Sequence, residues 1–195
     1  MIPLRLSWGV GLPHASRLIM RFTLLIAAFA AVAAASASRT PIILAQQPRS
    51  DLDSIVVERT LCFGTCPAYR LSLRRGGDVH FRSRNPGESI DTTDHVAPTV
   101  LDSLYARAAR SQFFSLPDSV DEGSSLCPIY ATDHPTLTLT FHGRSTKRVF
   151  YYTGCYLRND FHTVAPLLQA LARLAVAVDS ATGARRWIHP ARRPR

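Results

Sequence analysis

The hydrophobic pattern of the chain switches twice from a strand period to a helix period. Each time, two short segments alternate apolar and polar residues around a glycine turn, and apolar residues at helical spacing follow. Alternation with period two is typical of a strand buried on one face, and spacing of three and four residues is typical of an amphipathic helix. With a β-rich segment at 54–58, the predicted element order is β-β-β-α-β-β-α.

The first unit begins with a predicted hairpin at 69–82. Alternating residues flank Gly76-Gly77-Asp78, a sequence that tolerates the positive φ of a tight turn. Pro98 suits the first position of a helix, and Phe113 and Phe114 are expected to close that helix against the core. The apolar stripe of this helix consists of Val100, Leu101, Leu104, Tyr105 and Ala108.

The second unit has a predicted hairpin at 136–152 around Gly143. Pro166 falls in the first turn of the following helix, which Asp160 or Thr163 is expected to cap. The apolar stripe of this helix consists of Val164, Leu167, Leu168, Leu171, Leu174, Ala175 and Val178.

These elements predict an α+β fold. A mainly antiparallel sheet of four to five strands, with two helices packed on one face, is the simplest arrangement that buries both helical stripes. We expect a single domain at 54–188, with Trp187 folding back on the core. A linker at 38–53 precedes it, and a disordered basic tail at 189–195 follows it.

Residues 1–37 have the order of a secretory signal peptide. Three Arg and no acidic residue precede an uncharged run at 22–35. That run of about 14 residues is shorter than the roughly 20 that a membrane-spanning helix needs. Cleavage is expected after Ala37 or Ala45, and Met20 is an alternative start. The sequence therefore predicts an exported protein, periplasmic or extracellular, with no transmembrane span after signal cleavage.

The formal charge of +9 does not indicate nucleic-acid binding. The chain has 23 Lys and Arg and 14 Asp and Glu, but three Arg lie in the signal region and five lie at or beyond Arg185. Residues 38–184 contain 15 basic and 14 acidic residues. A nucleic-acid partner is not expected, because the folded part lacks the excess positive charge that binds phosphates.

The chain has four cysteines, for which three disulfide connectivities exist. Cys66 lies just before the first hairpin, while Cys127 precedes and Cys155 follows the second. Because the outer ends of a hairpin meet, we predict the pair Cys127–Cys155, which leaves Cys62–Cys66 as a local ring. In the chain-entropy model a loop of about 29 residues gives about 3.6 kcal/mol, whereas a five-residue ring gives roughly 2 kcal/mol.

The segment from Arg59 to Tyr69 reads R-T-L-C-F-G-T-C-P-A-Y and precedes an alternating strand and a Gly-Gly-Asp turn. It resembles the opening of the exported bacterial family called domain of unknown function 6438. The motif Thr132-Asp133-His134-Pro135, the later strand pair and a closing helix ending near Trp187 are similar to that family too. The resemblance covers roughly 55–187 and implies a fold and an exported location, with no established activity. Cys127 and Cys155 are additions to the family pattern, which fits their pairing with each other.

The motif Cys62-x-x-x-Cys66-Pro67 also permits a thiol redox or copper interpretation, because thiolates bind Cu(I). A structural disulfide is favoured, because the motif leads into a strand and not into a helix whose N-terminus would lower the thiol pKa. The sequence has no zinc-ligand pairing, phosphate loop or G-x-S-x-G elbow, so we expect no cofactor and no catalytic residue. Asp133 is expected to pin the turn that enters the strand at Thr136 through its carboxylate.

The outward face of the predicted sheet is the candidate binding surface. It is expected to carry Arg70, Arg74, Arg82 and Thr138. Such a face is either solvated or binds an anionic polymer or a partner protein of the envelope. The leading hypothesis is an exported, disulfide-stapled module that acts as a non-catalytic binding or structural accessory of the cell envelope. The alternative is a thiol redox or copper-handling protein that uses Cys62 and Cys66.

Overall fold

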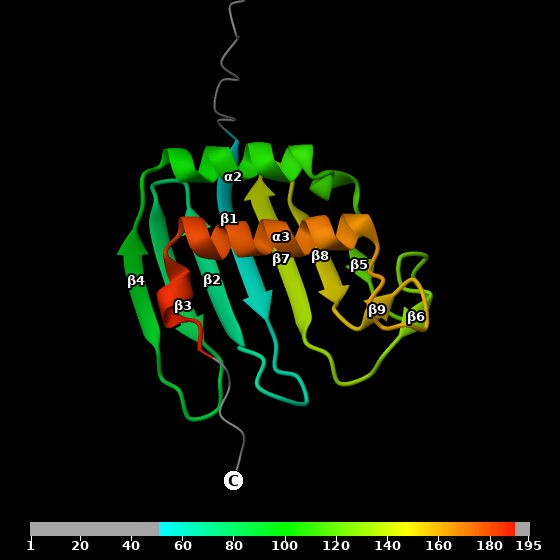
Figure 1. Cartoon of the computed structure of the whole chain (residues 1–195). Helices are drawn as coiled ribbons and strands as arrows, with labels where there is room; N and C mark the ends of the chain where they lie inside the picture. The colour runs from blue at the N-terminus through cyan, green and yellow to red at the C-terminus, as the bar shows by residue number, and fades with distance from the viewer. Residues whose placement is uncertain (1–50, 190–195) are drawn as a thin grey trace, which may run out of the picture. The chain divides into compact units, whose positions relative to one another are not determined.

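The computed structural model describes residues 51–189 (Figure 1). The predicted signal peptide at 1–37, the linker before residue 51 and the tail beyond His189 lie outside the described residues. Within the described range, neither α-helix has the length and hydropathy that a bilayer-spanning helix needs.

The described chain forms two β-sheets and two α-helices. The strands are β1 (Leu52–Arg59), β2 (Tyr69–Arg74), β3 (Asp78–Ser83), β4 (Asp91–His95), β5 (Ser119–Val120), β6 (Ile129–Tyr130), β7 (Thr136–Gly143), β8 (Lys147–Tyr152) and β9 (Cys155–Tyr156). The helices are α2 (Thr99–Arg110) and α3 (Pro166–Ala181), with the short 3₁₀ helices η2 (Phe113–Ser115) and η3 (Ala184–Trp187).

Seven strands form the main sheet in the order β4-β3-β2-β1-β7-β8-β5. All neighbours are antiparallel except β5, which runs parallel to β8. Figure 1 shows α2 and α3 crossing the strands on one face of this sheet. The structure therefore confirms a mixed α+β fold with two helices, but the prediction of four to five strands was wrong.

The strands that the prediction missed have no apolar alternation to reveal them. β4 reads D-T-T-D-H and contains no apolar residue, and β5 has only two residues. Both lie at sheet edges, where backbone pairing on one side is enough to hold a strand. Polar or short edge strands also protect a sheet from pairing with other chains.

β1 is the central strand of the main sheet. It begins at Leu52, two residues before the predicted start, and it pairs with both β2 and β7. Ile55 and Val57 are fully buried, and Val56 on the opposite face is only 5% exposed. Burial on both faces explains why β1 reads as a short apolar run and not as an alternation.

The two helices bury the predicted stripes. Leu101 and Leu104 of α2, and Leu171 and Leu174 of α3, are at most 5% exposed. The expected cap of α3 was wrong, because the helix begins at Pro166 after Ala165 without a side-chain cap.

Asp160 instead caps the turn ahead of α3. Its Oδ1 accepts the backbone N–H groups of His162 and Thr163 at 3.0 Å, and its Oδ2 accepts the Thr163 hydroxyl at 2.6 Å. These hydrogen bonds, the Thr163 hydroxyl first, lower the pKa of Asp160 to about 2. The turn is therefore closed before the first helical residue is reached.

The disulfide Cys127–Cys155 ties the segment between α2 and β7 to the end of the β7–β8 hairpin. Its Cα atoms are 4.6 Å apart, and both residues are at most 2% exposed. The small β6–β9 sheet forms beside it, with Tyr130 opposite Cys155. The bond thus pins a long connection to the core, and it closes the loop that the hairpin topology predicts.

Replacing both residues of this pair with alanine should cost more stability than opening the Cys62–Cys66 ring. We expect a loss of about 3.6 kcal/mol for Cys127→Ala/Cys155→Ala and about 2 kcal/mol for Cys62→Ala/Cys66→Ala, because the longer loop gains more freedom in the unfolded chain. Urea unfolding of the two double variants measures the difference. An equal or larger loss from opening the short ring would contradict this assignment.

Candidate binding site

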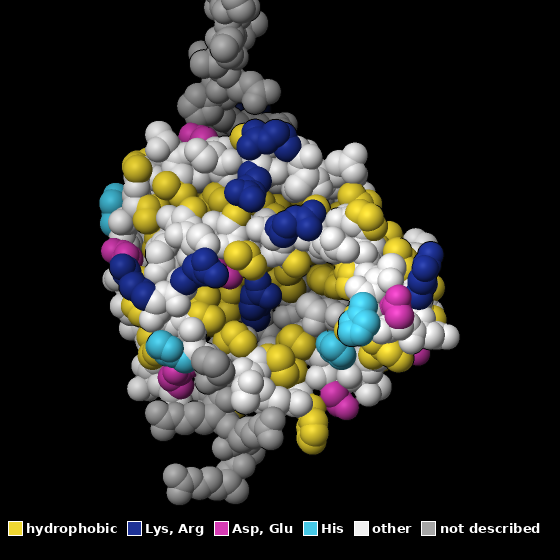
Figure 2. Space-filling model, viewed as in Figure 1, with side chains coloured by type: hydrophobic (Ala, Val, Ile, Leu, Met, Phe, Trp, Pro, Cys, Tyr) yellow, Lys and Arg dark blue, Asp and Glu magenta, His cyan; other side chains and the backbone are white. Residues whose placement is uncertain are grey.

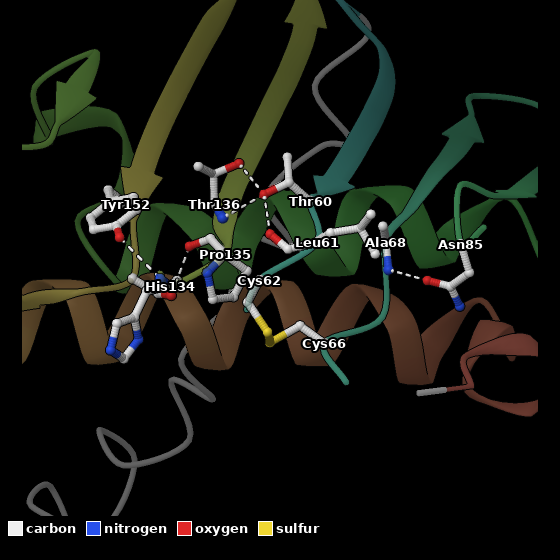
Figure 3. The surroundings of a disulfide bond; sticks show 11 residues. Thr60, Leu61, Cys62, Cys66, Ala68, Asn85, His134, Pro135, Thr136 and Tyr152 are labelled. Atoms are coloured by element: carbon white, nitrogen blue, oxygen red, sulfur yellow. Dashed lines mark hydrogen bonds between the residues drawn. A yellow bond between two sulfur atoms is a disulfide. The ribbon is translucent and has the colours of Figure 1, made fainter. Parts of the chain in front are cut away.

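The C-terminal end of β1 leads into a five-residue ring closed by Cys62–Cys66, whose Cα atoms are 5.6 Å apart. The start of β7 is tied to this segment, because the Thr60 hydroxyl accepts the backbone N–H of Thr136 at 2.8 Å (Figure 3). The backbone N–H of Phe63, inside the ring, donates to the carbonyl of Asp133 at 3.1 Å. The ring and the entry to β7 therefore form one continuous wall beside the end of β1.

Asp133 lies in the turn before β7 with a positive φ of 67°. Its main-chain carbonyl makes the contact to the ring, and its carboxylate accepts the hydroxyl of Thr132 at 3.3 Å. The hydrogen bond that links this turn to the ring thus runs through the main chain.

A pocket of about 560 Å³ opens on the helix-bearing side of the sheet, between this wall and α3. Its volume lies within the range of small-molecule sites. Figure 2 shows the face hollowed below α3, with a basic side chain in the hollow. The polar lining residues are Arg59, Tyr69, Thr136, Asp179 and Arg185. The remaining lining residues are Cys66, Pro67, Pro135, Val176 and Ile188.

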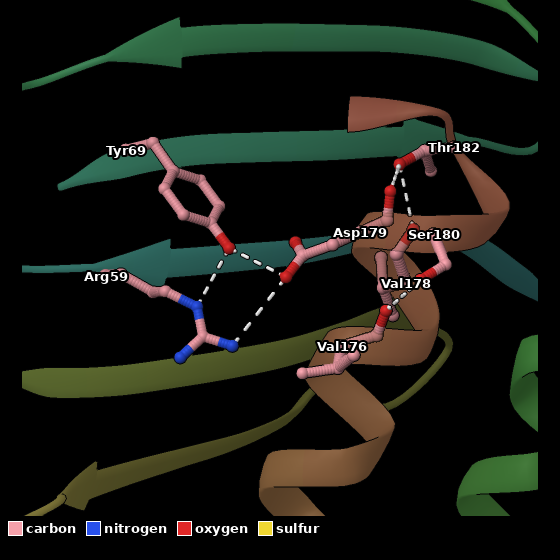
Figure 4. A network of polar contacts seen from close by, with 7 residues as sticks. All are labelled: Arg59, Tyr69, Val176, Val178, Asp179, Ser180 and Thr182. Carbon is pink, nitrogen blue, oxygen red and sulfur yellow. Dashed lines mark hydrogen bonds and ion pairs between the residues drawn. The ribbon is translucent and has the colours of Figure 1, made fainter. Parts of the chain in front are cut away.

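A buried polar network forms the floor of this pocket. Arg59 Nε donates to the Tyr69 hydroxyl at 2.8 Å, and that hydroxyl donates to Asp179 Oδ2 at 2.8 Å (Figure 4). Arg59 Nη2 lies 3.7 Å from the same carboxylate oxygen. Because the three residues come from β1, β2 and α3, the network fixes the helix to the sheet where the pocket opens.

Burial sets the electrostatics of this network. The Asp179 side chain is only 7% exposed, and burial raises the pKa of its carboxyl group, an effect that the nearby Arg59 charge opposes. Among the described residues, Asp179 Oδ1 is buried without a hydrogen-bond partner. Burial also raises the pKa of Tyr69, which keeps its hydroxyl protonated as a donor. Burial therefore makes the charged form of Asp179 less favourable than it would be in water, and Arg59 opposes this effect.

The outer edge of the Arg59 guanidinium is available to a ligand. Its Nε donates to Tyr69 and its Nη2 pairs with Asp179 at 3.7 Å, while within the part of the chain that is described Nη1 makes no hydrogen bond. The side chain is 23% exposed and lines the pocket. The network therefore holds a planar, charged guanidinium in one orientation in the lining of the pocket.

η3 brings a second positive charge to the pocket with Arg185. The position of η3 is fixed by Trp187, whose ring lies 5.6 Å from that of Phe81, as expected from the sequence. Arg186 pairs with Asp94 of β4 and lies over the Trp187 ring, 4.3 Å from its centroid. The basic residues of η3 therefore divide their roles, one facing the pocket and one holding the helix.

The candidate binding face predicted from the sequence lies on the other side of the sheet. Arg70 pairs with Glu58 at 2.7 Å, and Arg82 lies 3.5 Å from Asp91. Thr138 is only 5% exposed, while Arg74 is exposed. Acidic neighbours thus balance two of the three arginines, and the four residues do not form one accessible basic patch.

The state of the cysteines bears on the alternative of a thiol redox or copper-handling protein. All four cysteines are in disulfides. Across residues 51–189, no group of three or more His, Cys, Asp or Glu is placed to hold a metal ion. Copper binding by Cys62 and Cys66 would first need their disulfide to be reduced.

A model of the family described as "Domain of unknown function (DUF6438)" matches residues 53–172. The chain belongs to this family. The match runs from β1 into α3, so it includes Arg59 and Tyr69 and ends before Asp179. A comparison with curated proteins gave no match.

Sequence reasoning did not find the network, although one signal was present. Asp179 lies four residues after Ala175 and eight after Leu171, on the apolar stripe of α3. An acidic residue at such a position is buried and needs a partner. The partner could not be identified from the sequence, because Arg59 lies 120 positions earlier and just beyond the strand predicted at 54–58.

The stability of the protein should depend on pH through Asp179. A carboxyl group with a raised native pKa contributes stability that is fully present below the unfolded pKa of about 3.9 and is lost as pH rises through the native pKa. Asp179→Asn removes this dependence. We therefore expect the stability of the variant relative to wild type to increase as pH rises above about 4.

Urea unfolding of both proteins across this pH range measures the change. The Asn side chain can itself lower the free energy of unfolding, but that loss is the same at every pH. It therefore does not change how the difference in stability between variant and wild type varies with pH. Parallel pH profiles for wild type and variant would contradict the assignment.

Proposed function

We propose that the protein is an exported binding module of the cell envelope, stapled by disulfides, whose pocket at the end of β1 binds an anionic ligand. Export is supported by the basic and then apolar order of the first 37 residues. It is also supported by the pairing of all four cysteines, since disulfides persist in oxidising compartments.

The single observation that carries the binding proposal is the orientation of Arg59. Its guanidinium is fixed by Tyr69 and Asp179, and the side chain lines a pocket large enough for a small molecule. A planar fork of N–H donors matches the two oxygens of a carboxylate or phosphate. Because the fork is already fixed, little side-chain entropy is lost when an anion binds.

The polar groups of the pocket favour binding over catalysis. Tyr69 is kept protonated by burial and already donates its hydrogen bond to Asp179. The Thr136 hydroxyl contacts the Thr60 hydroxyl at 3.1 Å. The pocket therefore offers charge, hydrogen bonds and apolar walls, and its hydroxyl–carboxylate pair, Tyr69 and Asp179, is held in a buried network with a protonated hydroxyl.

The role of Arg59 can be tested by substitution. We expect sodium acetate and inorganic phosphate to shift the amide NMR signals of pocket residues in the oxidised protein. In Arg59→Gln the affinity for the better probe should fall at least about tenfold, because one charge-assisted hydrogen-bond pair is worth about 1.5–3 kcal/mol. Arg74→Gln, which removes a charge from the opposite face, is the matched control and should bind like wild type.

Equal binding by Arg59→Gln and wild type would show that the site lies elsewhere. Shifts confined to β2 and β3 residues of the opposite sheet face would favour the surface around Arg74 instead.

A second function is supported by one observation: Cys66 of the disulfide ring lines the same pocket as Arg59. A nearby guanidinium stabilises a thiolate, as thiol exchange or copper handling by Cys62 and Cys66 would need. For a binding module we expect both disulfides to survive mild reductant, with no free thiols counted by mass spectrometry. Selective reduction of Cys62–Cys66 with stoichiometric Cu(I) uptake would favour the thiol function.

A further inference from the structure

At the floor of the pocket Arg59 is paired with Asp179, a buried carboxyl group whose charged form is disfavoured by burial. Asp179 Oδ2 receives the Tyr69 hydroxyl and lies 3.7 Å from Arg59, whereas Oδ1 is buried without a partner among the described residues. Any anion that docks on Arg59 competes with this carboxylate for the same positive charge. Ligand binding and the charge of Asp179 are therefore linked by position.

We propose that the pocket binds a monocarboxylate that carries a small apolar group, and that Asp179 takes up one proton from solution as the ligand binds. This inference rests on the proposed function, because it specifies the ligand of the same site and the state of the acid beneath it.

The carboxylate follows from the shape and surroundings of Arg59. Nη1 and the N–H of Nη2 that points away from Asp179 are parallel donors, which fit the two oxygens of a carboxylate. The walls around it are apolar at Pro67, Pro135 and Ile188, and the Val176 side chain is 44% exposed. A ligand whose charge is attached to a small hydrocarbon group can cover these walls, whereas inorganic phosphate would leave their apolar surface exposed to water. A free short-chain acid and the C-terminal residue of a peptide share this chemistry.

The proton follows from the charges that face Asp179. They come from three elements: Arg59 from β1, Tyr69 from β2 and Arg185 from η3. The other ionisable side chain of α3, Arg173, is exposed. A bound carboxylate adds a negative charge beside Arg59 and thereby weakens the main attraction that keeps Asp179 ionised. Burial already raises the pKa of Asp179, so both effects favour its neutral form.

The exchange balances in charge and in atoms. The proton leaves a solvent or buffer acid, and an O–H bond forms at Asp179 Oδ1, the oxygen that accepts no described hydrogen bond. Tyr69 continues to donate to Oδ2. The negative charge beside Arg59 then belongs to the ligand and no longer to Asp179, and no electron is transferred.

Calorimetric titration of the oxidised protein tests both parts. The probes are isobutyrate, N-acetyl-Ala-Ala with a free carboxylate, the same dipeptide as its C-terminal amide, and inorganic phosphate. Each titration is run at one pH in two buffers of different ionisation enthalpy, which gives the number of protons taken up. We expect one or both carboxylate probes to bind with an uptake approaching one proton, and the amide to bind at least about tenfold more weakly. Binding by isobutyrate alone identifies a free acid, and tighter binding by the dipeptide identifies a peptide terminus.

Two variants separate the roles of the residues. Asp179→Asn should bind the carboxylate without proton uptake and with an affinity that no longer falls as pH rises, whereas Arg74→Gln should match wild type in both respects. The buffer comparison on wild type alone keeps the test decisive if Asp179→Asn folds poorly. Carboxylate binding without proton uptake, or equal binding of acid and amide, would overturn this inference.

The probes also distinguish failure of this inference from failure of the proposed function. Phosphate binding that Arg59→Gln abolishes, with no carboxylate binding, would overturn the inference and leave an anion site in place. Absence of binding by all the anionic probes would remove both.

Discussion

The pairing of β1 between β2 and β7 is the constraint on which the rest of the structure depends. It joins the two hairpin-and-helix units into one sheet, so that both helices can cover the same face. The pairing also determines where β1 ends: Arg59 is opposite Tyr69 on one side and Leu137 on the other. The pocket lies at this end because the strand stops there and the disulfide ring turns the chain away.

The Arg59–Tyr69–Asp179 network costs free energy that an apolar core would not. Replacing a buried ion pair with packed hydrophobic side chains is often neutral or stabilising, so such a pair is weak support for a purely structural role. Here the pair sits at the floor of an open pocket, and the guanidinium keeps one edge unengaged. A ligand that binds to this edge of Arg59 would explain why α3 carries the charged Asp179 at a position where an apolar residue would pack.

Sequence reasoning found the features that leave a periodic or topological signal. The two hairpins and both helical stripes follow from spacing alone. The β4 strand and the cap of α3 were missed or misassigned, because edge pairing and local turn closure leave no such period. The pocket was missed because its polar residues are brought together by the register of the central strand and by the packing of α3 and η3. The acidic partners of Arg70 and Arg82 were missed for the same reason, because they come from neighbouring strands.

The central claim is that Arg59, and not the arginines of the opposite sheet face, receives an anionic ligand. The most direct measurement is the side-chain NMR spectrum of the arginine Nε and Nη groups during titration with isobutyrate. We expect the Arg59 signals to shift and the rotation of its guanidinium to slow, while the signals of Arg70, Arg74 and Arg82 stay in place. Shifts of those three with an unchanged Arg59 would contradict it.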